Sequence, residues 1–220
     1  AVLHRPEVSS IAGLIAVFCY FVFTAGDSGF LSASGTRNYL EVAAVIGIIA
    51  VPVSLLMIAG EFDLSVGSMI GASGIVVSYA VVYSGWPLWA ALLVGMAIAA
   101  VVGVFNGMVV VKTVLPSFVV TLGALYVIRG ATLALTQNVA GTTSVDGVVG
   151  ASDGDPLQPL FHGDVFGVDV SLVWFIAITI VATWVLVRTR FGNWIFATGG
   201  DVVAARQSGV PVQRVKVTLY

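Results

Sequence analysis

Six long apolar runs alternate with shorter polar segments along the chain. Each run is close to the ~20 residues that a helix needs to cross a hydrocarbon core about 30 Å thick. Because a backbone in contact with lipid must satisfy its own hydrogen bonds, we expect every run to be a helix. The pattern predicts an all-α, polytopic transmembrane protein with about six spans, in which residues 1–220 form one domain. The runs cover residues 8–25, 39–60, 64–84, 88–111, 117–136 and 170–187.

The composition supports a membrane location. Hydrophobic residues make up 59% of the chain and charged residues only 9%, with a mean hydropathy of +1.06. Soluble domains carry about a quarter charged residues. The net charge of −2 argues against a nucleic-acid partner. The first run, which follows Arg5, also fits the apolar core of a signal peptide, and this alternative leaves the other five runs unchanged.

Basic residues predict the orientation of these spans. If the N-terminus lies in the cytoplasm, Arg37 is the one basic residue in an outer loop, and Arg129 lies within a span. Under the positive-inside rule this orientation is favoured over its reverse. The Asp-rich stretch 138–169 then faces outward and the polar stretch 188–210 faces the cytoplasm. The seven residues placed inside are Arg5, Lys112, Arg188, Arg190, Arg206, Arg214 and Lys216.

The polar stretch 188–210 reads as a short helix that needs a partner. Gly199 and Gly200 can supply a sharp turn, and Asp201 stands where an N-cap belongs. Gly209 is placed to end the helix, and Pro211 prevents it from continuing. About two turns of helix are not stable alone in water. A segment lying on the lipid surface and a helix that docks on another protein both fit this pattern.

No catalytic constellation is evident, so we expect a chain that is not an enzyme and holds no metal. Phosphate-loop, zinc-protease and serine-hydrolase motifs are missing. Asp153 and Asp155 have the spacing of metal ligands, but we interpret them as part of a solvated loop.

Polar side chains within or beside the spans are the better functional candidates, because burying them is costly without partners. They either line a path for a polar solute or tie helices together, and Asp63 fits a cap at the start of the third helix. Gly67 with Gly71, and Gly103 with Gly107, are small-residue pairs at which another backbone can approach closely. Such contacts suit both helix tilting and static packing. The polar candidates are Glu61, Asp63, Ser65, Asn106, Ser117, Thr121 and Arg129.

Three stretches resemble the permease subunits of bacterial ABC importers for simple sugars of the ribose, xylose, arabinose and galactose kind. Residues 60–68 are similar to the family's Gly-Gly-Ile-Asp-Leu-Ser-Val-Gly-Ser signature. Residues 115–123, followed by Arg129 and Gly130, resemble its second motif, and residues 190–209 resemble its cytoplasmic coupling segment. The likeness runs from about residue 36 to residue 220. Glu61 stands where the family more often has Gly, and Asp201 where it more often has Asn.

The resemblance implies a multi-pass protein of the bacterial inner membrane that translocates a sugar without altering it. Its partners would be cytoplasmic ATPase subunits, a second permease subunit expected to be another copy, a periplasmic or surface solute-binding protein, and membrane lipid. ATP and Mg would bind the ATPase, with no cofactor on this chain. The family has further spans after the coupling segment, so we expect the chain to be a C-terminally truncated piece. The implied ATPase-coupling residues are Gly199, Gly200, Asp201, Ala204, Ala205, Arg206, Ser208 and Gly209.

Three alternatives stay open at this point. The first is an ABC permease of the same architecture for a branched-chain amino acid or a nucleoside. The second is an ion-coupled secondary transporter, which would need Glu61 or Asp63 as its coupling carboxylate. The third is a membrane enzyme, weakened by the missing catalytic set.

Overall fold

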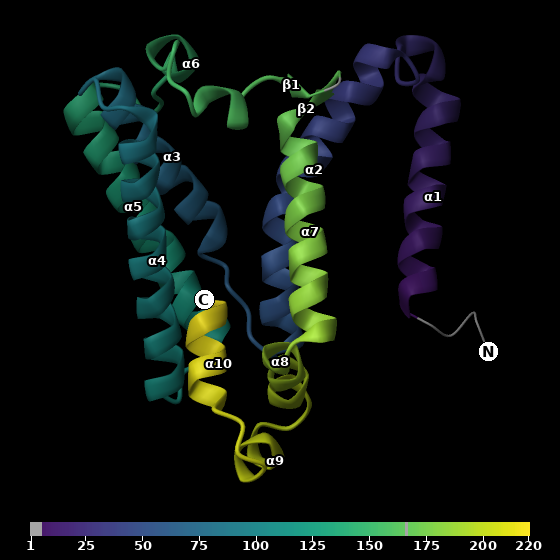
Figure 1. The fold of residues 1–220 in the computed structure, drawn as a ribbon, viewed down its shortest axis with the longest axis vertical. Coiled ribbons are helices and arrows are strands. Elements are labelled where there is room, and N and C mark those ends of the chain that lie inside the picture. Colours follow the sequence, from purple (N-terminus) through teal and green to yellow (C-terminus); the bar gives the residue numbers. More distant parts are fainter. Residues whose placement is uncertain (1–5, 166) are drawn as a thin grey trace.

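The computed structural model describes residues 6–165 and 167–220, and most of them are helical (Figure 1). Two short 3-10 helices and one small hairpin complete the elements. The order is α1 (Pro6–Ala25), η1 (Gly26–Ser28), α2 (Ala33–Ile58), α3 (Val66–Val82), α4 (Leu88–Lys112), α5 (Ser117–Ala140), α6 (Val148–Ala151), η2 (Gln158–Leu160), β1 (Asp164–Val165), β2 (Val168–Asp169), α7 (Val170–Arg188), α8 (Arg190–Gly200), α9 (Val202–Gln207) and α10 (Val212–Leu219).

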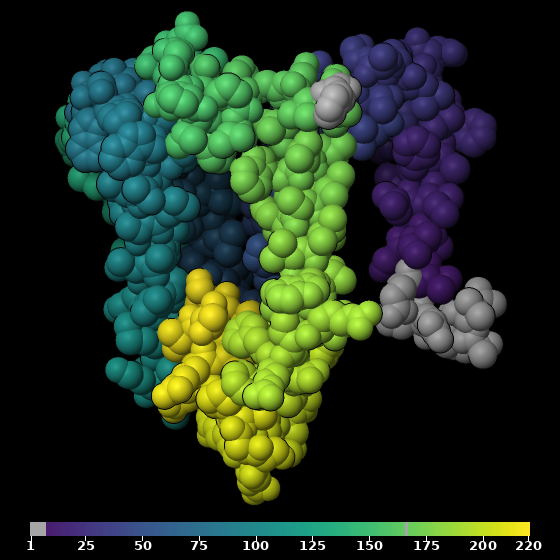
Figure 2. Space-filling model, viewed as in Figure 1, coloured from purple at the N-terminus to yellow at the C-terminus, as the bar shows by residue number. Residues whose placement is uncertain are grey.

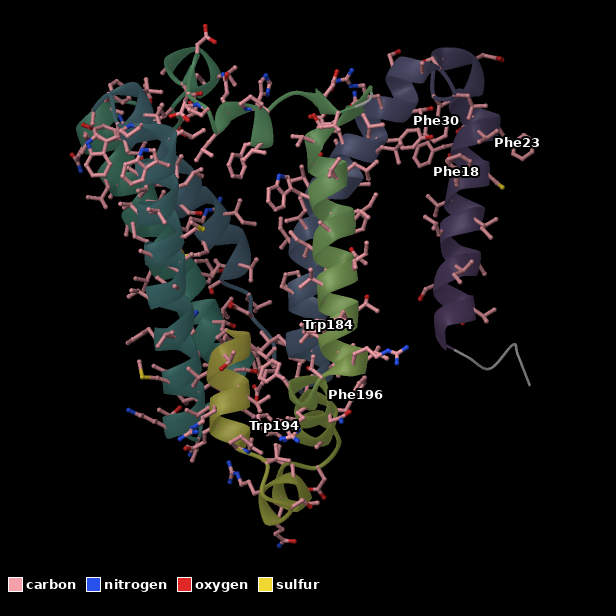
Figure 3. The ribbon with its side chains drawn as sticks, in the orientation of Figure 1. Phe18, Phe23, Phe30, Trp184, Trp194 and Phe196 are labelled. Carbon is pink, nitrogen blue, oxygen red and sulfur yellow. The ribbon has the colours of Figure 1, made fainter. Side chains whose placement is uncertain are left out.

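The long helices form two groups. In one group α2 packs along α7, and in the other α3 packs against α4 and α5. Helix α10 lies between the groups, where it contacts α4, α8 and α2 (Figure 1). Figure 2 shows that this face of the molecule is hollowed between α4 and α7, directly above α10. Helix α1 stands to one side and reaches the rest through aromatic contacts such as Phe18 with Phe30 (Figure 3).

The helix lengths confirm a polytopic membrane protein. Five helices, α1, α2, α4, α5 and α7, are long and apolar enough to cross a membrane. Helix α3 is shorter, with 17 residues, or about 25 Å at 1.5 Å per residue. Large apolar side chains such as Phe23, Trp184 and Phe196 are exposed and project from the bundle (Figure 3).

Two segments expected to be loops contain regular structure. Helix α2 begins inside the expected loop 26–38, because the Ser32 side chain accepts a hydrogen bond from the Gly35 amide at 3.0 Å and caps the helix there. The Asp-rich stretch 138–169 contains α6, η2 and the antiparallel pair β1–β2. Asp155 in this stretch accepts the Leu88 amide at 2.8 Å, so it ties the stretch to the start of α4 instead of lying in a free loop.

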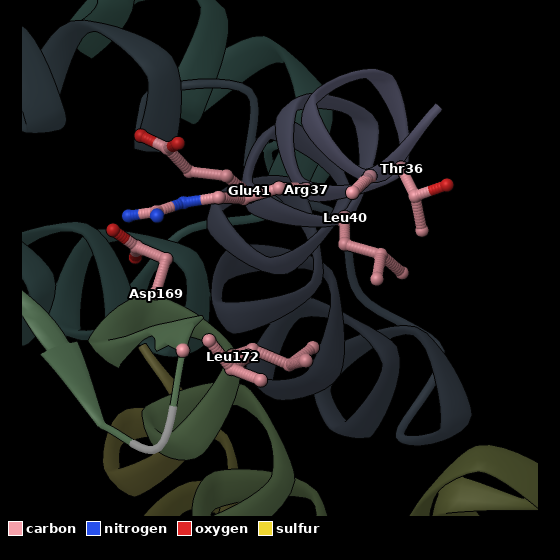
Figure 4. Close-up of a pocket in the computed structure, with 9 residues that line it drawn as sticks. Thr36, Arg37, Leu40, Glu41, Asp169 and Leu172 are labelled. Carbon is pink, nitrogen blue, oxygen red and sulfur yellow. The ribbon is translucent and has the colours of Figure 1, made fainter. Parts of the chain in front are cut away.

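Arg37 and its acidic neighbours mark the end of the bundle that carries the hairpin. Arg37 pairs with Asp164 of β1. The Arg37 side chain also lines a hollow of about 320 Å³ together with Glu41 and Asp169 (Figure 4). The Asp169 side chain accepts the Ser171 amide at 2.7 Å and caps α7. We call this the hairpin end, and the opposite end the α9 end.

A compact apolar cluster holds the α9 end together. Ala59, Ile195 and Val215 are fully buried against one another, and they come from the end of α2, from α8 and from α10. Trp194 and Leu219 pack around them. The two helices that flank α9 are therefore fixed to the end of α2, which leads directly into the candidate site.

Candidate transport and coupling site

Residues 60–65, which we call the linker, form a non-helical break between α2 and α3. Gly60 has φ of 85°, a left-handed conformation that favours glycine. The Gly60 amide donates to the Met57 carbonyl and the Glu61 amide to the Leu56 carbonyl, which is the Schellman pattern that ends a helix. The chain then continues without helical structure and bends at residues 64 and 65 before α3 begins at Val66.

Side chains from α5 satisfy the linker backbone. The Phe62 amide donates to Ser117 Oγ at 3.1 Å, and the Leu64 amide donates to Thr121 Oγ1 at 3.0 Å. The Thr121 hydroxyl in turn donates to the Ser117 carbonyl of its own helix at 2.9 Å. Both side chains are buried. Non-helical backbone is tolerated at membrane depth only where protein groups replace water, and here two hydroxyls do so.

The linker lies inside the bundle, near the α9 end. Thr121 stands four residues into α5, or about 6 Å along the axis, and Asn106 stands six residues before the last residue of α4, or about 9 Å. Both contact the linker region. The break in the helical backbone is therefore set within the membrane-crossing part of the molecule, where polar groups are rare and costly.

Asp63, Ser65 and Asn106 form a chain of hydrogen bonds. Asn106 Nδ2 donates to Ser65 Oγ at 3.0 Å, and Ser65 Oγ donates to Asp63 Oδ1 at 2.6 Å. Asp63 Oδ1 also accepts the Ser65 amide, which closes a turn before α3. The prediction that Asp63 is the cap of α3 is wrong, because Ser65 occupies the N-cap position and the carboxylate stabilises the turn before it. Within the described residues, the buried Asn106 Oδ1 has no hydrogen-bond partner.

Glu61 binds a cation from α10. Its Oε1 atom pairs with Lys216 Nζ, and both side chains are largely buried, with 9% and 17% exposed. The Tyr220 hydroxyl donates to the Phe62 carbonyl at 3.1 Å. Helix α10 and Tyr220, the residue that follows it, thus contact the linker through two polar side chains. Sequence reasoning identified Glu61 as unusual but missed both partners, since nothing in local spacing links residue 61 to residues 216 and 220.

Helix α9 has the termini that the sequence predicted. Asp201 Oδ1 accepts the Val203 and Ala204 amides at 2.8 and 3.0 Å, which confirms the N-cap. Gly209, at φ of 81°, and Val210 close the other end by donating to the Arg206 and Ala205 carbonyls. The prediction of a turn at Gly199 and Gly200 is wrong, because these are the last residues of α8 and the chain turns at the extended Asp201.

Gly199 serves a close contact instead. A Cβ atom at this position would overlap the Ile58 carbonyl oxygen and lie 2.9 Å from its carbon. A Cβ at Gly200 would meet nothing within 4 Å among the described residues. The end of α8 therefore touches the backbone at the end of α2, two residues before the linker.

Most of α9 is exposed. Val203 is 62% exposed, and Ala204, Arg206, Ser208 and Gly209 are also at the surface. Ala205, at 4%, is buried within the chain itself. Helix α9 forms the tip of the molecule, beyond both helix groups (Figure 1). Among the six residues of α9, Ala205 is buried and Val202 is half-buried, and the other four are exposed.

Arg129 lies apart from the linker. It lines a hollow of about 350 Å³ between α3 and α5 with Gly67, Ser68 and Gly71. No described atom from another element lies within 4 Å of a Cβ at Gly67 or Gly71, so the close backbone approach expected there stays a prediction. It is confirmed for Gly107, where the Val217 Cα atom of α10 would lie 2.9 Å from such a Cβ. Gly103 meets the Tyr220 backbone in the same way.

Basic residues gather at the α9 end. Lys112 and Arg188 are the last residues of α4 and α7, while Arg190, Arg206, Arg214 and Lys216 belong to α8, α9 and α10. Arg37 lies at the hairpin end. Arg5, which also entered the orientation prediction, falls outside the described residues. The structure thus places six of the seven residues assigned to the cytoplasm at one end of the bundle.

Comparison with known proteins identifies the family. Residues 35–220 match the family described as branched-chain amino acid transport system / permease component. The chain belongs to this permease family. The match covers α2 to α10 and so includes the linker, α9 and the helices that flank it. Together with the five long apolar helices, membership in this permease family makes the chain a multi-pass inner-membrane protein.

Several curated relatives are transport permeases. The chain is 29% identical to the xylose transport system permease protein XylH of Escherichia coli K12, over 96% of this chain and 66% of that protein. It is 33% identical to the autoinducer 2 import system permease protein LsrD of Klebsiella pneumoniae, over 80% of this chain and 52% of that protein. It is 30% identical to LsrC of Enterobacter sp. 638, over 99% of this chain and 60% of that protein. The chain thus spans about half to two thirds of these relatives. No solved structure matches it.

Proposed function

We propose that the chain is the membrane-spanning permease subunit of an ATP-driven ABC importer for a simple sugar, with the α9 end in the cytoplasm. Separate ATPase subunits bind ATP and Mg and dock on α9. A solute-binding protein delivers the sugar at the hairpin end, and a second permease subunit, most simply another copy, completes the pathway. The relatives named for xylose and autoinducer 2 import support this choice over amino acids or nucleosides.

The observation that carries the proposal is the path from α9 to the linker. Helix α9 is exposed, yet the helices on either side of it pack on the end of α2 and on the linker. A displacement of α9 by a partner therefore reaches the break between α2 and α3 through rigid helices. That break is the one place at which the described long helices depart from helical backbone inside the bundle.

Polar groups around the linker suit a hydroxylated solute. Asn106 Oδ1 is a buried acceptor without a partner in the described structure, and sugar hydroxyls are donors that could satisfy it. The hollow above α10 lies between the two helix groups (Figure 2). An ion-coupled transporter is disfavoured, because Glu61 is paired with Lys216 and Asp63 accepts hydrogen bonds from Ser65.

Substitutions on the exposed face of α9 test the docking. In the full-length permease, Val203→Glu and Ala204→Glu should weaken co-purification of the ATPase by about tenfold or more, as expected for contacts near the centre of an interface. Ala205→Glu is unsuitable, because Ala205 is buried and a glutamate there would unfold α9 itself. Thr143→Glu is the matched control, because it adds the same charge at an exposed position of the hairpin end and should leave ATPase association unchanged.

Uptake of labelled simple sugars by cells with and without the full-length subunit tests the substrate class. ATP-dependent uptake that requires the subunit is expected for at least one simple sugar. Normal ATPase association by both α9 variants would refute the docking role, and uptake of only amino acids or nucleosides would refute the sugar assignment.

A further inference from the structure

Helix α9 is connected to the linker region from both sides. On its N-terminal side, Gly199 at the end of α8 lies against the Ile58 carbonyl. On its C-terminal side, Lys216 of α10 pairs with Glu61. Residue 58 is the last residue of α2 and residue 61 lies in the linker, so both contacts act on the same short piece of backbone.

The two contacts differ in kind. The Gly199 contact is steric, so it can push the end of α2 but cannot pull it. The Glu61–Lys216 contact is electrostatic and holds its partners together in both directions. Helix α10 itself lies against α4, where Val217 approaches Gly107. The ion pair is therefore the charged attachment through which α10 can draw the linker along when α9 moves, beside the neutral hydrogen bond from Tyr220 to the Phe62 carbonyl.

Burial distinguishes the Glu61–Lys216 ion pair from the Arg37–Asp164 ion pair, the other one in the described structure. Arg37 and Asp164 at the hairpin end are 46% and 39% exposed, and such pairs contribute little. Glu61 and Lys216 are 9% and 17% exposed, so both charges are largely removed from water and each depends on the other as its partner. The second carboxylate of the linker does not compete for Lys216 in this arrangement, because Asp63 accepts its hydrogen bonds from Ser65.

We propose that the Glu61–Lys216 ion pair makes the linker move with α9, so that Lys216 is a positioning residue for transport. The inference rests on the proposed function, since it needs an ATPase that displaces α9. It adds to that function one specific contact through which a movement of α9 reaches the linker. When the ATPase shifts α9, α10 shifts with it and carries Glu61, and the hydrogen bonds that Phe62 and Leu64 donate to α5 rearrange.

The test separates a coupling role from a purely structural one. The full-length permease is assembled with its ATPase and binding protein in liposomes, and sugar uptake, ATP hydrolysis and bound ATPase are measured together. Glu61→Gln and Lys216→Met each leave one buried charge without its partner, which strongly destabilises the fold. The combined variant Glu61→Gln/Lys216→Met leaves none. Lys112→Met, which removes an exposed cation at the same end, is the control.

The combined neutral variant should fold and keep its ATPase, yet import about tenfold less sugar per ATP hydrolysed, a loss within the range of coupled pairs. The exchanged variant Glu61→Lys/Lys216→Glu should restore most of the ratio, and Lys112→Met should leave it unchanged. Wild-type uptake per ATP in the folded neutral variant would overturn the inference, as would an exchanged variant that folds but stays uncoupled. If wild type itself lacks bound ATPase or ATP-dependent uptake, the proposed function fails instead.

Discussion

Gly199 offers a sharp test of the contact between α8 and the end of α2. Alanine at this position adds one methyl group directly into the Ile58 carbonyl, with the Ile58 and Ala59 carbonyl carbons at 2.9 and 3.2 Å. Non-bonded heavy atoms are most stable near 3.5–4.0 Å, so α8 must retreat by roughly 1 Å or more. The obstacle is backbone, which cannot rotate away as a side chain can. Overpacking of this kind costs about 1–3 kcal/mol.

Gly200→Ala is the matched control. It makes the same chemical change one residue later, where a Cβ meets no described atom within 4 Å and φ is not left-handed. Alanine is also the better helix former, so this variant should be neutral or more stable by up to about 1 kcal/mol. The two variants therefore differ by about 1–4 kcal/mol, with opposite signs expected.

Thermal unfolding of the full-length permease in detergent measures the difference. About 1 kcal/mol shifts Tm by roughly 2–4 °C for 150–250 residues and by less for a longer protein, so Gly199→Ala should melt measurably below both wild type and Gly200→Ala. Transport should fall with it, because the retreat of α8 loosens the contact between α9 and α2. Equal melting temperatures for the two alanine variants would show that α8 does not touch the Ile58 backbone.

Two further predictions concern the linker and α10. Thr121→Val keeps the volume of the side chain but leaves the Leu64 amide without its acceptor, so it should destabilise the protein by about 1–3 kcal/mol and reduce transport. Its control is Thr136→Val, which removes only a hydrogen bond within α5. If Thr121→Val and Thr136→Val lose similar amounts of Tm and transport, Thr121 does not act through the linker. Gly107→Ala should cost about 1–3 kcal/mol, because its methyl group meets Val217, whereas Gly71→Ala faces open space. A lower Tm for Gly71→Ala than for Gly107→Ala would contradict this packing.

The membrane class and most helix positions were predictable, since run lengths and apolar composition are local properties. Five of the six apolar runs became long helices. The remaining one, α3, is shorter than its run by two residues at each end, and the two at its start belong to the linker. Helices α8 and α10 were missed. Their signals were present, since Phe191, Trp194, Ile195 and Thr198 follow helical spacing, as do Val212, Val215 and Leu219. The polar composition of 188–210 concealed the first of these patterns.

The polar residues at the linker were predictable except that Arg129 lies apart from them, but their partners were not. Glu61, Asp63, Ser65, Asn106, Ser117 and Thr121 do meet at the linker. Lys216 was counted only for orientation, because an ion pair across 155 residues depends on how the whole chain folds. Likewise, a glycine needed for a close contact cannot be distinguished from a glycine needed for a turn without the neighbouring backbone. This is why Gly199 was assigned the wrong role.

The central claim is that α9 lies in the cytoplasm and is covered by the ATPase. A single cysteine at the exposed position 203, placed in a full-length protein from which Cys19 and any other cysteine have been removed, can be labelled with a membrane-impermeant maleimide. We predict no labelling in intact cells, ready labelling in inside-out vesicles stripped of the ATPase, and protection when the ATPase is added back. Labelling in intact cells, or labelling in vesicles that the ATPase does not diminish, would contradict the account.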